Sequence, residues 1–114
     1  MNAALDPTTC PAWKELQGLS EGFNPDLAQW FAKNPERATQ LSFTAAQLHV
    51  DLSKNLLTEP VLAALIRLAS QTKVEAHRDA MFAGEHINTT EDRAVLHTAL
   101  RRPREDKLEV DGQD

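Results

Sequence analysis

The sequence predicts a mixed α/β fold that is mainly helical, with a few short strands. Several segments repeat apolar residues every three to four positions, which is the period of an amphipathic helix. Between residues 41 and 53 the apolar residues alternate with polar ones, which is the period of a strand. A chain of 114 residues with 41% hydrophobic and 25% charged residues is typical of a soluble globular protein, so we expect one domain over residues 1–114.

The first helix is expected directly after the N-terminal residues. Thr8 or Thr9 can cap its start, and Pro11 suits its first turn because the proline nitrogen needs no hydrogen-bond acceptor there. Gly22 is expected to end it. Trp13 falls on its apolar face and is therefore predicted to anchor the core.

A second helix is expected to start near Asn24-Pro25-Asp26. Its apolar residues, which include Trp30, have amphipathic spacing, so this tryptophan is also predicted to be a core anchor. Asn34-Pro35 should end the helix, because the residue before a proline avoids helical geometry. Residues 36–39 are expected to form one further turn.

Two strands follow, over residues 41–45 and 48–53. Each alternates apolar and polar side chains, and the short connection favours an antiparallel pair. Ala45-Ala46-Gln47 contains no glycine or Asn-Gly pair, which weakens the prediction of a tight hairpin.

Two further helices are expected after the strands. Thr58 precedes Glu59 and Pro60 at the start of the first, which carries an apolar face as far as Ala69. The second should run over residues 74–83, with Met81 and Phe82 on its inner side and Gly84 as its stop.

The stretch from Ile87 to Arg101 predicts one more helix. Asn88, Thr89 and Thr90 offer capping oxygens, and acidic residues follow them at the positive end of the helix dipole. The apolar stripe of this helix is formed by Val95, Leu96, Ala99 and Leu100.

The C-terminal residues predict a short strand entering a turn. Leu108 and Val110 alternate with Glu109, and Asp111-Gly112 is a turn sequence. A lone strand at this position normally leads into another element, so we expect the chain to be part of a longer protein.

A basic edge on the predicted 88–101 helix is the main candidate site. Arg93, His97 and Arg101 would sit four residues apart, extended by Arg102 and Arg104, and guanidinium groups bind phosphate or carboxylate bidentately. The competing interpretation is structural, because cations near a helix C-terminus favour its dipole and neighbouring carboxylates can pair with them.

Three other kinds of site are weaker. Asp51, Ser53 and Lys54 lie at a strand end, where catalytic groups are common, but adjacent strand residues point to opposite faces and a polar turn after the strand explains them better. The glycines are too dispersed for a nucleotide-binding loop. A metal site would need histidines that are irregularly spaced, at positions His49, His77 and His86.

Charge and cysteine content exclude several classes of partner. The net charge of −5 gives no overall attraction to nucleic acid or to anionic membranes. Cys10 is the single cysteine, which indicates a reducing, intracellular setting, and neither a secretory signal nor a membrane-spanning run is apparent. We therefore expect a cytoplasmic protein without nucleic-acid or membrane partners.

Residues Met81 to Arg101, MFAGEHINTTEDRAVLHTALR, resemble the N-terminal signature of the glucose-6-phosphate isomerase family. VDLSKN upstream and LEVDGQD downstream are similar to other family segments, so the resemblance spans about residues 31–114. Two departures are Leu52, where the family often has tyrosine, and the run RRPREDK. The residues in register with the signature are Gly84, Ile87, Asn88, Thr90, Glu91, Arg93, His97 and Arg101.

The resemblance implies an N-terminal fragment of a larger α/β sandwich enzyme. Such enzymes interconvert glucose 6-phosphate and fructose 6-phosphate through a cis-enediol, without a cofactor, as homodimers. The family's catalytic and phosphate-binding residues lie in segments beyond Asp114, so no catalytic, cofactor or metal residue is expected here. The alternative is a free-standing α/β module that binds a phosphorylated ligand or protein partner through Arg93, His97, Arg101 and Arg102.

Overall fold

The computed structural model describes residues 5–113, so Met1–Ala4 and Asp114, the ends of the expected domain, lie outside it. It is a mixed α/β structure, as predicted, with two strands and a larger helical content. In chain order the elements are η1 (Pro7–Thr9), α1 (Pro11–Ser20), α2 (Leu27–Lys33), α3 (Arg37–Gln40), β1 (Ser42–Ala45), β2 (Leu48–Asp51), α4 (Glu59–Gln71), α5 (Val74–Phe82) and η2 (His97–Arg101).

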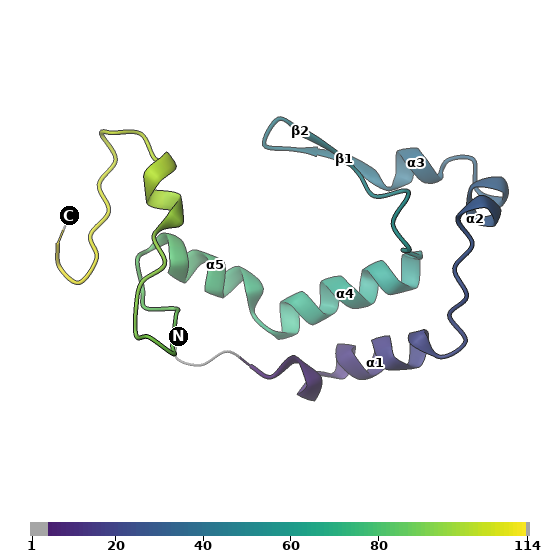
Figure 1. The fold of residues 1–114 in the computed structure, drawn as a ribbon, viewed down its shortest axis with the longest axis horizontal. Coiled ribbons are helices and arrows are strands. Elements are labelled where there is room, and N and C mark those ends of the chain that lie inside the picture. The colour runs from purple at the N-terminus through teal and green to yellow at the C-terminus, as the bar shows by residue number, and fades with distance from the viewer. Residues whose placement is uncertain (1–4, 114) are drawn as a thin grey trace.

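The elements form an open, curved arrangement and do not surround a common core (Figure 1). The radius of gyration is 18.8 Å. A compact domain of this length has a radius of gyration of about 13 Å. The buried apolar side chains within residues 5–113 are all small, namely Cys10, Ala12, Ala64 and Ala80. Residues 5–113 therefore contain very little hydrophobic core of their own.

Helices α1 and α4 lie side by side and make the main tertiary contact (Figure 1). Ala12 and Ala64 are almost completely buried between them, and small side chains let the two helices approach closely. Cys10 precedes α1 without giving a side-chain cap, and the Gln71 side chain of α4 accepts a hydrogen bond from the Ala12 amide at 2.9 Å. One helix thus satisfies a free amide at the start of the other.

The first four predicted helices are confirmed, with small shifts at their ends. The prediction that Thr8 or Thr9 caps α1 is wrong, because both lie in η1 and Cys10 precedes α1. Asp26 caps α2 by accepting from the Gln29 amide, and Thr58 caps α4 by accepting from the Val61 amide. Gly22 and Gly84 adopt positive φ angles of 70° and 80° just after α1 and α5. Both glycines therefore act as the predicted helix stops.

The predicted hairpin is also confirmed, although its turn lacks glycine. Strands β1 and β2 pair antiparallel, with Phe43 opposite Val50 and Thr44 opposite His49. Ala46 and Gln47 form the two-residue connection with φ angles of 50° and 66°. Positive φ at both positions is the requirement of a type I′ turn, which matches the strand twist at some cost for residues that have a Cβ atom.

Neither tryptophan is a core anchor, which corrects the prediction, since Trp13 and Trp30 are both only half-buried. Trp30 instead covers the guanidinium of Arg37, whose carbon atom lies 4.9 Å from the ring centroid. Arg37 is 7% exposed and donates to the carbonyls of Ser53, Asn55 and Leu57 at 2.8, 3.0 and 3.0 Å. This buried arginine fixes the loop between β2 and α4.

The prediction of a helix over residues 88–101 is wrong. Asn88 and Arg93 exchange both backbone hydrogen bonds at 3.1 Å, which closes a tight turn, and Asp92 has a φ of 52°. The polar side chains expected to cap a helix stabilise this turn instead, since Thr90 and the Glu91 amide both donate to the Asn88 side chain. Only the short 3₁₀ helix η2 remains, and Leu100 of the predicted apolar stripe is 91% exposed.

The predicted C-terminal strand is also wrong, although its turn is confirmed. Val110 and Gln113 form a single antiparallel bridge around Asp111 and Gly112, which have φ angles of 53° and 78°. No neighbouring strand within residues 5–113 extends this bridge into a sheet. Phe82, predicted to face inward on α5, is 48% exposed.

Candidate functional site

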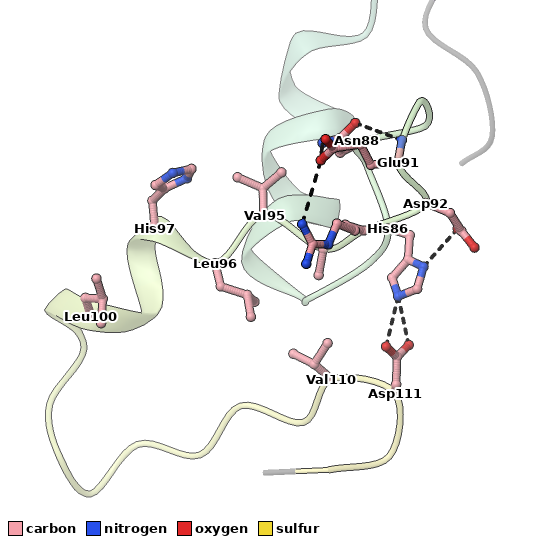
Figure 2. A pocket seen from close by; sticks show the side chains of 12 residues that line it. His86, Asn88, Glu91, Asp92, Val95, Leu96, His97, Leu100, Val110 and Asp111 are labelled. Atoms are coloured by element: carbon pink, nitrogen blue, oxygen red, sulfur yellow. Dashed lines mark hydrogen bonds and ion pairs between the residues drawn. The ribbon is translucent and has the colours of Figure 1, made fainter.

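An open hollow of about 680 Å³ is the candidate site, because two of the predicted basic residues line it (Figure 2). Its walls come from the Asn88–Arg93 turn, η2 with the residues before it, and the Val110–Gln113 turn. Leu96 and Val110 point towards one another across it, whereas His97 lies on the side far from His86 (Figure 2). Both apolar and polar side chains thus line the hollow.

The basic edge does not exist as a cluster. Its predicted spacing required an α-helix, and the chain is a turn at Arg93 and a 3₁₀ helix only from His97 onward. Arg101 is exposed in η2, and Arg102 lies beside a second hollow, where it pairs with Asp106 at 3.6 Å. The structural interpretation of Arg102, pairing with a nearby carboxylate, is confirmed.

The charge of the hollow is unfavourable for a phosphate. Arg93 is its single arginine among the described residues, and Glu91, Asp92 and Asp111 line the same surface. Arg93 itself lies 4.0 Å from the Glu91 carboxylate. An anion in this hollow would meet three carboxylates, so the geometry does not support the anion-binding module.

His86 is the side chain of the site that links two of its turns, and from the sequence it was considered only as one of three irregularly spaced histidines for a metal site. Its Nδ1 lies 3.0 Å from Asp92 Oδ1, and its Nε2 lies 2.9 Å from Asp111 Oδ1 (Figure 2). The hydrogen bond to Asp92 and then that to Asp111 raise the pKa of His86 above its usual value. These bonds join two turns, and the bond to Asp111 connects residues that are 25 apart in sequence.

The other predicted site residues are structural or dispersed. Asp51 accepts from the Ser53 amide at 2.8 Å, and hydrogen bonds from Ser53 lower the pKa of the Asp51 carboxyl. Ser53 is buried while Lys54 is exposed, so they do not form a nucleophile and its base. No three His, Cys, Asp or Glu side chains in residues 5–113 are arranged to hold a metal ion.

No helix in the described part of the chain has the length and apolar content needed to cross a bilayer.

Comparison with known proteins identifies the family. The family model for phosphoglucose isomerase matches residues 51–114. The glucose-6-phosphate isomerase of Corynebacterium kroppenstedtii is 51% identical over 116 residues, covering 100% of this chain and 21% of that protein. The enzymes of the same name from Mycolicibacterium smegmatis and Bifidobacterium longum are 52% and 48% identical, covering 97% and 100% of this chain.

This chain spans about a fifth of the length of the curated relatives it matches. The match nevertheless runs along essentially all of its residues, including the Asn88–Arg93 and Val110–Gln113 turns that form the hollow. The chain belongs to the phosphoglucose isomerase family.

Proposed function

We propose that this chain is one segment of an enzyme that interconverts glucose 6-phosphate and fructose 6-phosphate, and that it supplies structure and no reacting group. The observation that carries the proposal is about 50% identity, along the whole chain, to proteins named glucose-6-phosphate isomerase. From the same relationship we infer a sugar phosphate substrate, a homodimer and a cytoplasmic location for the complete enzyme. Catalytic, cofactor and metal residues are then expected outside this chain.

The exposed apolar surface supports a role as part of a larger protein. Leu65 and Ile66 on α4 are 42% and 60% exposed, and Val74 at the start of α5 is 52% exposed. Leu65 and Val74 line one hollow together with Leu5 and Leu68, and apolar surface of this kind is typical of a surface that another part of a protein covers. We propose that the remaining segments of the isomerase cover this face.

A complementation experiment tests the proposal. The Corynebacterium kroppenstedtii enzyme would be prepared without the 116 residues that match this chain, and isomerisation of fructose 6-phosphate would be followed in a coupled assay. We expect no activity from either part alone and measurable activity when they are expressed together. Activity of this chain alone, at a rate comparable with the complete enzyme, would contradict the proposal.

Two sets of variants refine the experiment. Leu65→Glu with Ile66→Glu should abolish complementation, because burying two carboxylates in an apolar contact costs several kcal/mol, roughly enough to prevent assembly. Arg93→Ala with His97→Ala is the matched control and should leave the turnover of the assembled enzyme unchanged. Loss of turnover in this control would assign the hollow a direct part in catalysis.

A further inference from the structure

The imidazole of His86 occupies an unusual position between two carboxylates. Its side chain is 33% exposed, and each ring nitrogen is within 3.0 Å of an aspartate oxygen. Asp92 belongs to the Asn88–Arg93 turn and Asp111 to the Val110–Gln113 turn (Figure 2). One side chain therefore connects two turns that have no backbone hydrogen bond to each other among those the structure describes.

The geometry requires a particular protonation state. Ionised carboxylates can only accept hydrogen bonds, and a neutral imidazole carries a single N–H. A neutral His86 would leave one ring lone pair facing a negatively charged oxygen at about hydrogen-bond distance, which is repulsive. Both contacts are favourable only when the ring is an imidazolium that donates from Nδ1 and Nε2.

Both aspartates sit at backbone positions that need support. Asp92 and Asp111 have φ angles of 52° and 53°, in the left-handed region that residues other than glycine adopt at a cost. Hydrogen bonds to His86 fix the positions of their carboxylates. Val110 adds an apolar contact, since its Cγ2 would lie only 2.8 Å from a Cβ atom placed on Gly84.

We propose that His86 is a protonation-dependent clasp that holds the Val110–Gln113 turn against the Asn88–Arg93 turn and releases it when the imidazolium loses its proton. The other charged or titratable groups around the hollow are Glu91, Arg93 and His97. Glu91 engages Asn88 and Arg93, and His97 is on the far side of the hollow, so Asp92 and Asp111 are the direct partners of the ring.

The raised pKa of His86 determines the direction of the pH effect. The pKa of His86 is raised by Asp92 and Asp111, so the clasp is complete below the ordinary histidine pKa of about 6.5. The stabilisation that the clasp gives to the closed turn is lost as the pH rises through the raised pKa of His86. The turn is therefore closed below about pH 6.5 and opens as the pH rises past the raised pKa of His86.

Hydrogen exchange of the intact isomerase that contains this chain tests the clasp. The amides of Val110 and Gln113 donate to each other's carbonyl at 2.7 and 3.0 Å, so their protection reports closure of the turn. After correction for the intrinsic pH dependence of exchange, we expect protection to fall by about fivefold from pH 6 to pH 9, the size expected for one partly exposed ion pair. A flat profile in the wild-type protein would overturn the proposal without any variant.

Variants distinguish deprotonation of His86 from other causes of lower amide protection at high pH. His86→Gln should give low protection that no longer changes between pH 6 and 9, and His86→Lys should restore a pH-independent attraction for the aspartates. Asp111→Asn should flatten the profile of the 110–113 amides. His97→Gln, a histidine of the same hollow, is the control and should retain the wild-type profile; a flat profile here, or a normal profile in His86→Gln, would contradict the assignment.

Discussion

Two loops of this chain are each held by one basic side chain, and they are held in opposite ways. Arg37 is buried, carries a permanent charge and donates to three backbone carbonyls of residues 53–57. His86 is partly exposed, is titratable and donates to two side-chain carboxylates. The first arrangement depends on geometry alone, because carbonyl acceptors and an arginine do not titrate in the physiological range. The second depends on pH.

The comparison also separates two parts of the fold. Arg37 holds a loop between well-formed elements, β2 and α4, and Trp30 from α2 shields its guanidinium. His86 holds two turns that form no sheet with other elements of the described chain. A loop framed by regular elements can be fixed by a buried group, whereas turns at the surface rely on exposed charges.

Replacing Arg37 by lysine should have the largest effect. A lysine ammonium cannot donate in the planar, three-way pattern that the guanidinium achieves, so two of the three carbonyl acceptors lose their donors. A hydrogen bond from a charged donor contributes about 1.5–3 kcal/mol, so the loss of two such bonds should make local opening of residues 53–57 easier by about 3 kcal/mol. Hydrogen exchange of the Asn55 and Leu57 amides in the intact protein measures this opening. Arg67→Lys, at an exposed arginine, is the control, and equal effects of the two variants would refute the role of Arg37.

Replacing Gly84 by alanine should have the next largest effect, and it acts on the His86 side of the comparison. The new Cβ atom would lie 2.8 Å from Val110 Cγ2 and 3.3 Å from the Glu109 carbonyl oxygen, at a φ of +80°. The left-handed conformation alone costs roughly 1–2 kcal/mol for a residue with a Cβ atom. Opening of the Val110–Gln113 turn relieves the clash, and overpacking costs about 1–3 kcal/mol, so the protection of the Val110 and Gln113 amides should fall about tenfold.

Gly18 provides the matched control for that substitution. It lies inside α1, and a Cβ atom built on it meets nothing within 4 Å. Gly18→Ala should therefore stabilise the helix by about 0.5–1 kcal/mol. If Gly84→Ala also proved neutral or stabilising, Val110 would not pack against Gly84 in solution.

The sequence predicted those elements whose signals are local. Asp26 and Thr58 mark helix starts, Gly22 and Gly84 mark helix ends, and the alternation over residues 41–53 marks the hairpin. In each case the side chains that decide the structure lie within a few residues of it. The mixed α/β class and the structural pairing of Arg102 were predictable for the same reason.

The misses concern structure that depends on distant contacts. Asn88 to Asp92 have the composition of a helix start, but Asp92 is bonded to His86, which also contacts Asp111. That tertiary contact acts together with the local hydrogen bonds of the Asn88 side chain to favour a turn, and the capping residue types alone do not distinguish a turn from a helix start. The prediction of a basic edge was wrong for the same reason, because it required that helix. The burial of Arg37 could not be predicted from the sequence either, because its acceptors are backbone carbonyls 16 to 20 residues away.

Raising the pH should distinguish the two loops directly, although the effect is smaller than that of either substitution. Asp51 caps the Ser53 amide beside the Arg37 loop, and hydrogen bonds from Ser53 lower the pKa of its carboxyl. A lowered carboxyl pKa gives stability that is present above the ordinary value of about 3.9 and is lost only as the pH falls through the lowered one. Protection of the Ser53 amide should therefore stay constant from pH 6 to pH 9, while that of Gln113 falls. A parallel fall at both amides would indicate general loosening and not release at His86.

The ion pair between Glu15 of α1 and Arg67 of α4 should contribute least. The guanidinium donates to both carboxylate oxygens, but the two side chains are 43% and 49% exposed, so water and salt screen the pair. A double-mutant cycle with Glu15→Gln and Arg67→Gln should give a coupling energy of about 0.2–1 kcal/mol that decreases with added salt. Because Ala12 and Ala64 already bring the helices together, neither variant should separate α1 from α4. A coupling energy near that of the Arg37 loop would mean that charge, and not close packing of small residues, holds this helix pair.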